Sequence, residues 1–114
     1  MSRLICAADA LPDGGDGQRF VMDTGGAQSP AFVVRWHGDV YAFCNVCPHV
    51  GAELDWNPGR FFDDSGNYLI CALHGALFEP DTGECVAGPC AGMPLSRLAV
   101  VERDGGIFLE AREA

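Results

Sequence analysis

Two short segments, each with one cysteine and one histidine, constrain the fold of this chain more than any other feature. The first is Cys47-Pro48-His49 and the second is Cys71-Ala72-Leu73-His74, and residues 50–70 separate them. A thiolate and an imidazole together suit either zinc or an iron–sulfur centre. Side chains of one segment can reach different metal ions only from a curved loop, because a strand alternates its side chains between two faces. Pro48, Gly51 and Gly75 supply that curvature, so we expect two loops that meet at one site.

The sequence of these loops resembles the Rieske ferredoxin family. Two stretches carry the resemblance, C-P-H-V-G-A-E-L from Cys47 and C-A-L-H-G-A-L-F from Cys71, and it extends over residues 40–109. Among common iron–sulfur sites, the Rieske [2Fe-2S] centre is the one with two cysteines on one iron and two histidines on the other. The resemblance implies one such cluster. Its ligands would be Cys47 and Cys71 on the inner iron, with His49 and His74 on the outer iron.

The rest of the sequence predicts short strands. The chain has 15 glycines and 7 prolines, which interrupt every candidate helix, and no window carries the apolar period of a helix. Runs of β-branched and aromatic residues between turn signals predict strands at 4–6, 19–22, 31–36, 40–43, 60–62, 68–70, 76–78, 85–86, 98–102 and 107–110. Residues 11–17 read as a surface loop with nothing to bury, and His37 as a solvated turn residue.

We therefore expect an all-β fold with a single domain over residues 1–114. The resemblance implies a small antiparallel β-sandwich with a cluster-binding subdomain at one tip. That subdomain would consist of two ligand loops, at about residues 44–56 and 71–79.

Charge and hydropathy restrict the partners and the compartment. The formal net charge of −9, from 16 acidic and 7 basic side chains, argues against nucleic acid or an anionic membrane as a partner. No apolar run approaches membrane-spanning length, and no signal peptide or twin-arginine leader can be read after Met1. We expect a cytoplasmic monomer, in a reducing compartment where paired cysteines are more often metal ligands than disulfides.

A zinc site is the main alternative from another class of function. Cys44-Asn45-Val46-Cys47 is a C-x-x-C motif, and with Cys71 and His74 it could form a Cys3His zinc site by spacing alone. The chain would then be a structural zinc-binding interaction module. This alternative leaves His49 without a role and the matched glycine after each ligand pair without an explanation.

Besides Cys6 in the first predicted strand, three further cysteines are not needed for the cluster. Cys44, Cys85 and Cys90 are expected to be small, partly buried apolar residues. A bond between Cys85 and Cys90 under oxidation is left open by the sequence.

The resemblance also implies a low reduction potential. High-potential members of the family have a serine directly after the glycine of the second loop and a tyrosine two residues further on, and a disulfide joins their loops. The corresponding residues here are Ala76 and Phe78 for the hydroxyls, and Ala52 and Leu73 for the disulfide. The hydroxyl groups and the disulfide that raise the reduction potential are therefore missing, as in ferredoxins that serve oxygenases.

The predicted function is one-electron transfer without catalysis. The sequence shows no glycine-rich nucleotide loop and no room for the second, catalytic iron domain of a terminal oxygenase. We expect a soluble Rieske ferredoxin that passes electrons from a flavin-dependent ferredoxin reductase to a terminal oxygenase of the aromatic-ring-hydroxylating type. The alternative in the same chemistry is the small subunit of a larger reductase, such as assimilatory nitrite reductase. Partners are expected to dock on an apolar tip around Pro48, Val50, Leu73 and Ala76.

Overall fold

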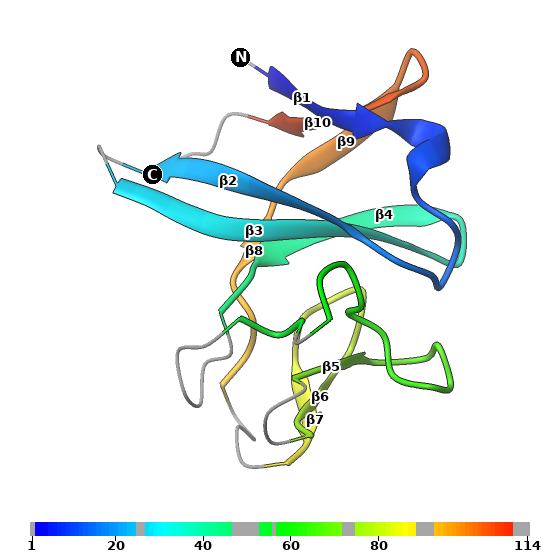
Figure 1. Ribbon diagram of the computed structural model, residues 1–114, viewed down its shortest axis with the longest axis vertical. Coiled ribbons are helices and arrows are strands. Elements are labelled where there is room, and N and C mark those ends of the chain that lie inside the picture. The colour runs from blue at the N-terminus through cyan, green and yellow to red at the C-terminus, as the bar shows by residue number, and fades with distance from the viewer. Residues whose placement is uncertain are drawn as a thin grey trace.

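The chain forms three small antiparallel sheets (Figure 1). The computed structural model describes residues 2–24, 27–46, 53–55, 57–71, 75–88 and 93–110. The elements in chain order are β1 (Ser2–Ala7), the 3-10 turn η1 (Ala8–Ala10), β2 (Gln18–Thr24), β3 (Ala27–Trp36), β4 (Asp39–Cys44), β5 (Leu69–Ile70), β6 (Leu77–Phe78), β7 (Cys85–Ala87), β8 (Arg97–Leu98), β9 (Val100–Arg103) and β10 (Gly106–Glu110). The predicted all-β fold is confirmed, and η1 is the only helical turn in the described part of the chain.

The three sheets are stacked as layers. We call β1-β10-β9 the outer sheet, β2-β3-β4-β8 the central sheet and β5-β6-β7 the small sheet. In Figure 1 the outer and central sheets lie together at one end of the molecule, and the small sheet lies at the other end. The outer and central sheets make the predicted sandwich. The predicted tip subdomain has its own sheet in addition to its loops.

The central sheet is buried on both faces. Residues 31–34 of β3 are all inaccessible to solvent, although neighbouring side chains in a strand point to opposite faces. Ala31 and Val33 pack into the core between the central and outer sheets, which we call the sandwich core. Phe32 and Val34 pack into the core shared with the small sheet, which we call the subdomain core. A continuous apolar run is what burial on both faces requires.

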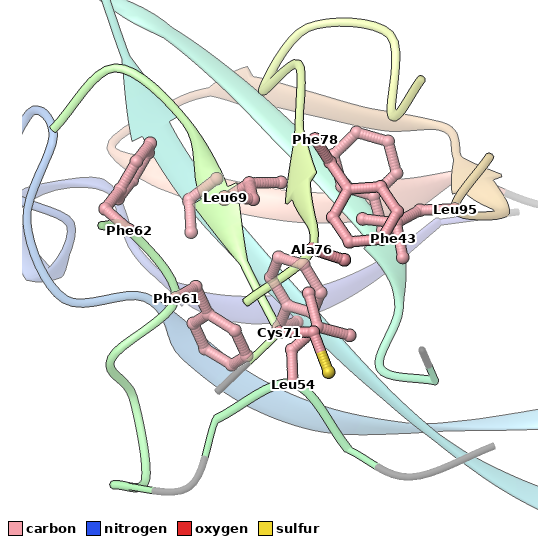
Figure 2. Close-up of a cluster of buried hydrophobic side chains, with 11 residues drawn as sticks. Phe43, Leu54, Phe61, Phe62, Leu69, Cys71, Ala76, Phe78 and Leu95 are labelled. Carbon is pink, nitrogen blue, oxygen red and sulfur yellow. The ribbon is translucent and has the colours of Figure 1, made fainter. Parts of the chain in front are cut away.

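Aromatic rings dominate the subdomain core (Figure 2). The rings of Phe32 and Phe61 stack with centroids 4.0 Å apart and an interplanar angle of 10°, and Phe43 lies 5.9 Å from Phe32. The other buried residues of the subdomain core are Val34, Leu54, Phe62, Leu69, Cys71, Ala76, Phe78 and Leu95. The stacked pair therefore attaches the segment before the small sheet to the central sheet.

An ion pair joins the two sheets of the sandwich. Both guanidinium Nη atoms of Arg35 in β3 donate to the Glu102 carboxylate in β9, at 2.9 and 2.8 Å. Arg35 also donates to the carbonyl groups of Leu11 and Ala8. The hydrogen bonds from Arg35 lower the pKa of Glu102 in the folded protein. This contribution to stability is therefore present above the pKa of Glu102 in the unfolded chain and is lost as the pH falls through its folded pKa.

Two predictions were wrong about the segments 98–102 and 11–17. Residues 98–102 do not form one strand, because Leu98 lies in β8 and pairs with Ala42, whereas Val100 begins β9 in the outer sheet. Both side chains pack on the sandwich core, so the alternating pattern does not reveal the change of sheet at Ala99. The loop 11–17 does have something to bury, since Leu11 is only 3% exposed and belongs to the same core.

The predicted hairpin of 60–62 with 68–70 is much reduced. Residues 60–62 form no strand, and Phe62 makes a single bridge to Leu69. The backbone N–H of Ile70 donates to the Phe61 carbonyl at 2.9 Å. Burial of Phe61 and Phe62, rather than ladder pairing, holds this segment.

The stacked rings lead to a prediction about stability. Phe61→Ala should lower the free energy of unfolding by about 3–5 kcal/mol, because it removes a fully buried ring and leaves a cavity between the small and central sheets. Phe61→Leu keeps most of the apolar volume and should cost about 1 kcal/mol. Denaturant unfolding of the three proteins measures both values. A cost below about 1 kcal/mol for Phe61→Ala would mean that the two layers do not depend on this contact.

Candidate metal centre

The structure places one of the four predicted ligands. Cys71 directly follows β5 and is fully buried in the subdomain core (Figure 2). Cys47, His49 and His74 lie outside the described residues. The arrangement of the site must therefore be read from Cys71 and from the described residues at the two ends of each loop.

Backbone hydrogen bonds close the second ligand loop. The Cys71 N–H donates to the Ala76 carbonyl at 2.9 Å, and the Gly75 N–H donates to the Cys71 carbonyl at 2.8 Å. Gly75 has φ of 71°, in the left-handed region where glycine has no steric penalty. Cys71 and Ala76 are both inaccessible to solvent. Residues 71 and 76, at the two ends of this segment, are therefore bonded to each other and fixed in the same core.

Side chains close the first ligand loop. Asn45 directly follows β4, and its Oδ1 accepts a hydrogen bond from the backbone N–H of Leu54 at 2.9 Å. The Leu54 side chain lies in the subdomain core together with Cys71 (Figure 2). The described ends of both loops thus meet in one core, as the two-loop prediction requires.

The chain after β7 packs closely against Ala76, at the end of the second loop. Gly88 has φ of 99°, and a Cβ built on it would lie 2.8 Å from the Cα of Ala76. No other residue type fits this contact without displacing the backbone of Ala76. Ala76 was predicted to be part of an exposed apolar tip, and that prediction was wrong, because the chain at Gly88 covers it.

The placement of Cys44 argues against the zinc alternative. Cys44 in β4 packs against the sandwich core, whereas its neighbour Phe43 lies in the subdomain core with Cys71. Cys44 and Cys71 therefore belong to opposite faces of the central sheet, where they cannot share one zinc ion. Within the described residues, no group of three or more His, Cys, Asp or Glu is arranged to hold a metal ion.

The spare cysteines that the structure describes are partly buried, as predicted. Cys44 packs on the sandwich core and Cys85 on the subdomain core. The Cys85 Sγ also lies 3.3 Å from the Ala87 carbonyl, within range of a weak hydrogen bond. Cys90, and with it the open question of a bond to Cys85, lies outside the described residues.

His37 is a turn residue, as predicted. It is exposed in the turn between β3 and β4, with φ of 52°, and its backbone N–H donates to Asp13 Oδ1 at 2.9 Å. Its ring stacks on Trp36 with centroids 3.9 Å apart. This turn lies at the other end of β4 from Asn45 and from the first ligand loop.

Sequence reasoning missed the residues that support the loops. Asn45, Asp55 and Gly88 were not singled out, although the first two are buried and the third packs on Ala76. A buried amide and carboxylate look like surface residues in a sequence, because their partners are not adjacent in the chain.

No helix in the described part of the chain is long and apolar enough to span a membrane.

The contact at Gly88 leads to a second prediction about stability. Gly88→Ala should destabilise the protein by at least about 1 kcal/mol more than Gly105→Ala, because both positions have positive φ but only Gly88 is also crowded. A Cβ at Gly105 meets nothing within 4 Å. Thermal unfolding of both variants measures the difference. Equal losses would mean that the chain at Gly88 can move away from Ala76 at little cost.

The match to a family model covers most of the chain. The model of the Rieske [2Fe-2S] domain matches residues 2–102. The menaquinol:cytochrome c reductase iron-sulfur subunit of Geobacillus thermodenitrificans is 33% identical over 72 residues, which are 63% of this chain and 40% of that protein. The chain thus spans less than half the length of this relative.

Solved structures match the chain over nearly its whole length. The ferredoxin of carbazole 1,9a-dioxygenase from Nocardioides aromaticivorans IC177 is 28% identical with a TM-score of 0.74, over 98% of this chain and 99% of that chain. A protein assigned as an NADH-dependent nitrite reductase small subunit from Mycobacterium tuberculosis is 25% identical with a TM-score of 0.74, over 100% of this chain and 96% of that chain. From the family match and the shared fold, the chain belongs to the Rieske [2Fe-2S] domain family and carries one [2Fe-2S] cluster.

Proposed function

We propose that this protein is a Rieske ferredoxin, a one-electron carrier that receives electrons from a flavin-dependent reductase and delivers them to a terminal oxygenase. The observation that carries the proposal is the nearly complete mutual coverage with the dioxygenase ferredoxin, 98% of this chain and 99% of that one. The proposal assigns the chain no catalytic site of its own and treats residues 1–114 as one Rieske domain. A cytoplasmic location stays a prediction.

We infer that Cys47, His49, Cys71 and His74 hold the cluster. Two thiolates and two imidazoles form the donor set of a Rieske centre. The observed placement of Cys71 supports the assignment, because it directly follows a strand in a core from which water is excluded, and Leu54 and Ala76 at the ends of the two loops lie in the same core. When bound there, the cluster supplies reversible one-electron chemistry at a potential set by its surroundings.

The side chains around Cys71 favour a low potential. Ala76 and Phe78 have no hydroxyl group, and both are fully buried in the same core as Cys71. A hydroxyl donor to a cluster sulfur stabilises the reduced, more negative form and raises the potential. The described residues of the second loop thus provide apolar contacts in place of such donors, which is the arrangement expected of a carrier that donates electrons to an oxygenase.

Three exposed apolar residues make up the docking surface that we propose for partners. Val46 follows Asn45 at the start of the first loop, Val86 lies in β7, and Met93 lies in the segment that leads to β8. They are 37%, 47% and 40% exposed. An apolar surface beside the ligand loops lets a partner approach closely through a small, transient contact. The net charge of −9 favours a partner surface that is neutral or basic.

One observation favours a second candidate function. The nitrite reductase small subunit is covered over 96% of its length and matches 100% of this chain, at the same TM-score as the ferredoxin. In that function the chain would be a permanent subunit of a larger reductase. The two functions differ in association, because a carrier exchanges between two partners whereas a subunit co-purifies with one.

Purification and reconstitution test the proposed function. The protein should be brown, with equal amounts of iron and acid-labile sulfide. Mixed with a flavin-dependent ferredoxin reductase and a terminal oxygenase, it should restore NADH-dependent oxygenation at substoichiometric amounts, because a carrier turns over. A colourless protein with zinc would refute the proposal. Stable co-purification with a large reductase subunit would support the second candidate.

The ligand assignment predicts different results for two histidines. His49→Ala should lose iron, sulfide and colour. His37→Asn should keep all three, because His37 lies in a turn at the far end of β4 and asparagine tolerates its positive φ. Iron analysis and visible spectra measure the difference. Full iron in His49→Ala would remove that residue from the ligand set.

The docking surface predicts a kinetic effect. Val86→Ser should slow electron transfer to the oxygenase by about 5- to 30-fold, corresponding to a loss of about 1–2 kcal/mol at the contact. Leu4→Ser, which changes an even more exposed apolar side chain in the outer sheet, should leave the rate unchanged. Stopped-flow oxidation of the reduced protein measures both rates. Equal rates for the two variants would place the docking surface elsewhere.

A further inference from the structure

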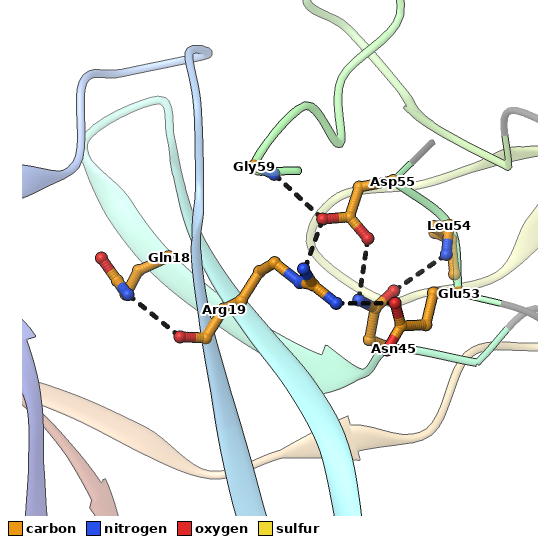
Figure 3. A network of polar contacts seen from close by, with 7 residues as sticks. All are labelled: Gln18, Arg19, Asn45, Glu53, Leu54, Asp55 and Gly59. Atoms are coloured by element: carbon orange, nitrogen blue, oxygen red, sulfur yellow. Dashed lines mark hydrogen bonds and ion pairs between the residues drawn. The ribbon is translucent and has the colours of Figure 1, made fainter. Parts of the chain in front are cut away.

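One buried side chain joins the two ends of the first loop (Figure 3). Asn45 is fully buried, and its Oδ1 accepts the Leu54 N–H at 2.9 Å. Its backbone N–H donates to the Pro30 carbonyl in β3, also at 2.9 Å. The residues immediately before and after the segment 46–53 are therefore in direct contact, and both are attached to the central sheet.

Asp55 completes this contact. Asn45 Nδ2 donates to Asp55 Oδ1 at 3.0 Å. The second carboxylate oxygen of Asp55 accepts the Gly59 N–H at 2.9 Å and lies 3.3 Å from Arg19 Nε in β2. The Asp55 side chain has no exposed surface. A buried carboxylate is tolerated there because both of its oxygens have donors.

Arg19 extends the contact to β2. Its Nη2 lies 2.6 Å from Glu53 Oε1, so one guanidinium holds the residues on either side of Leu54 (Figure 3). Arg19 and Glu53 are each about 40% exposed, so their pairing contributes little by itself. The buried Asn45–Asp55 contact is thus the part of the network that holds the two ends of the segment 46–53 together.

Leu54 connects the Asn45–Asp55 contact to the second loop. Its N–H is bonded to Asn45, and its side chain packs in the subdomain core with Cys71 (Figure 2). Protein cores are close-packed, so a shift of Leu54 changes the contacts around Cys71. The spacing between the two loops therefore depends on the Asn45–Asp55 contact.

We propose that Asn45 and Asp55 are positioning residues for the [2Fe-2S] cluster. By fixing the ends of residues 46–53, they fix where Cys47 and His49 stand relative to Cys71. This inference rests on the proposed assignment of Cys47 and His49 as ligands. Groups that orient metal ligands from outside typically change metal affinity by about 10- to 100-fold when they are removed.

The chemistry of the contact requires one amide and one carboxylate. Asn45 accepts a hydrogen bond from Leu54 and donates one to Asp55 at the same time. A carboxylate at position 45 can only accept, and it would face the carboxylate of Asp55. Exchanging the two groups restores one donor between the two side chains and leaves an acceptor for each of the N–H groups of Leu54 and Gly59.

This exchange provides the test. Asn45→Asp, Asp55→Asn and the two substitutions together are compared with the wild type as holoproteins, by the g values of the reduced cluster and by the rate of iron loss to a chelator. Each single variant should show shifted or broadened g values and iron loss at least about 10-fold faster. The combined variant should return to the wild-type g values and to within about threefold of its rate of iron loss. If a single variant fails to fold, the result of the combined variant decides the test in its place.

Asp13→Asn is the matched control for a purely structural role. The Asp13 carboxylate accepts the N–H groups of His37 and Gly38 at 2.9 and 2.6 Å, at the other end of β4. This control should lower the unfolding temperature and leave the g values unchanged. The inference is overturned if the single variants behave like Asp13→Asn, or if the combined variant is no better than either single one. A wild-type protein without iron and sulfide would instead refute the proposed function.

Discussion

Burial of the central sheet on both faces is the constraint on which the rest of this structure depends. The small sheet has strands of only two or three residues, too short to be stable alone. It persists because Phe32, Val34 and Phe43 present an apolar face to it. On the opposite face, Ala31 and Val33 are covered by the outer sheet. The sandwich therefore serves as a rigid support for the small sheet and for the ends of the two predicted ligand loops.

The two predicted ligand loops are closed at the same core by different means. The second loop is closed by hydrogen bonds of its own backbone between Cys71, Gly75 and Ala76. The first loop is closed by side chains, through the amide of Asn45 and the carboxylate of Asp55. The second closure needs few particular residue types beyond a glycine at positive φ. The first depends on two polar groups that must complement each other and are costly to bury unpaired.

The same architecture suits electron transfer. Buried contacts hold Cys71 and the ends of both loops, which limits structural change when the oxidation state changes. Val46, Val86 and Met93 are exposed apolar residues that can make the short-lived contacts of the proposed docking surface. The acidic charge of the chain favours encounter with a neutral or basic partner, but it does not select between an oxygenase and a larger reductase.

The sequence by itself determined the family resemblance and the all-β class and predicted the donor set, because ligand spacing, turn residues and alternation are local properties. It also identified His37 as a turn residue from its immediate neighbours. Only the tertiary structure decided which sheet each strand joins, since Leu98 and Val100 share one alternating pattern but pair in different sheets. It alone placed Cys44 and Cys71 in different cores and brought Asn45 to Asp55. The physical reason is that burial and polar pairing depend on partners distant in the chain, which no local pattern records.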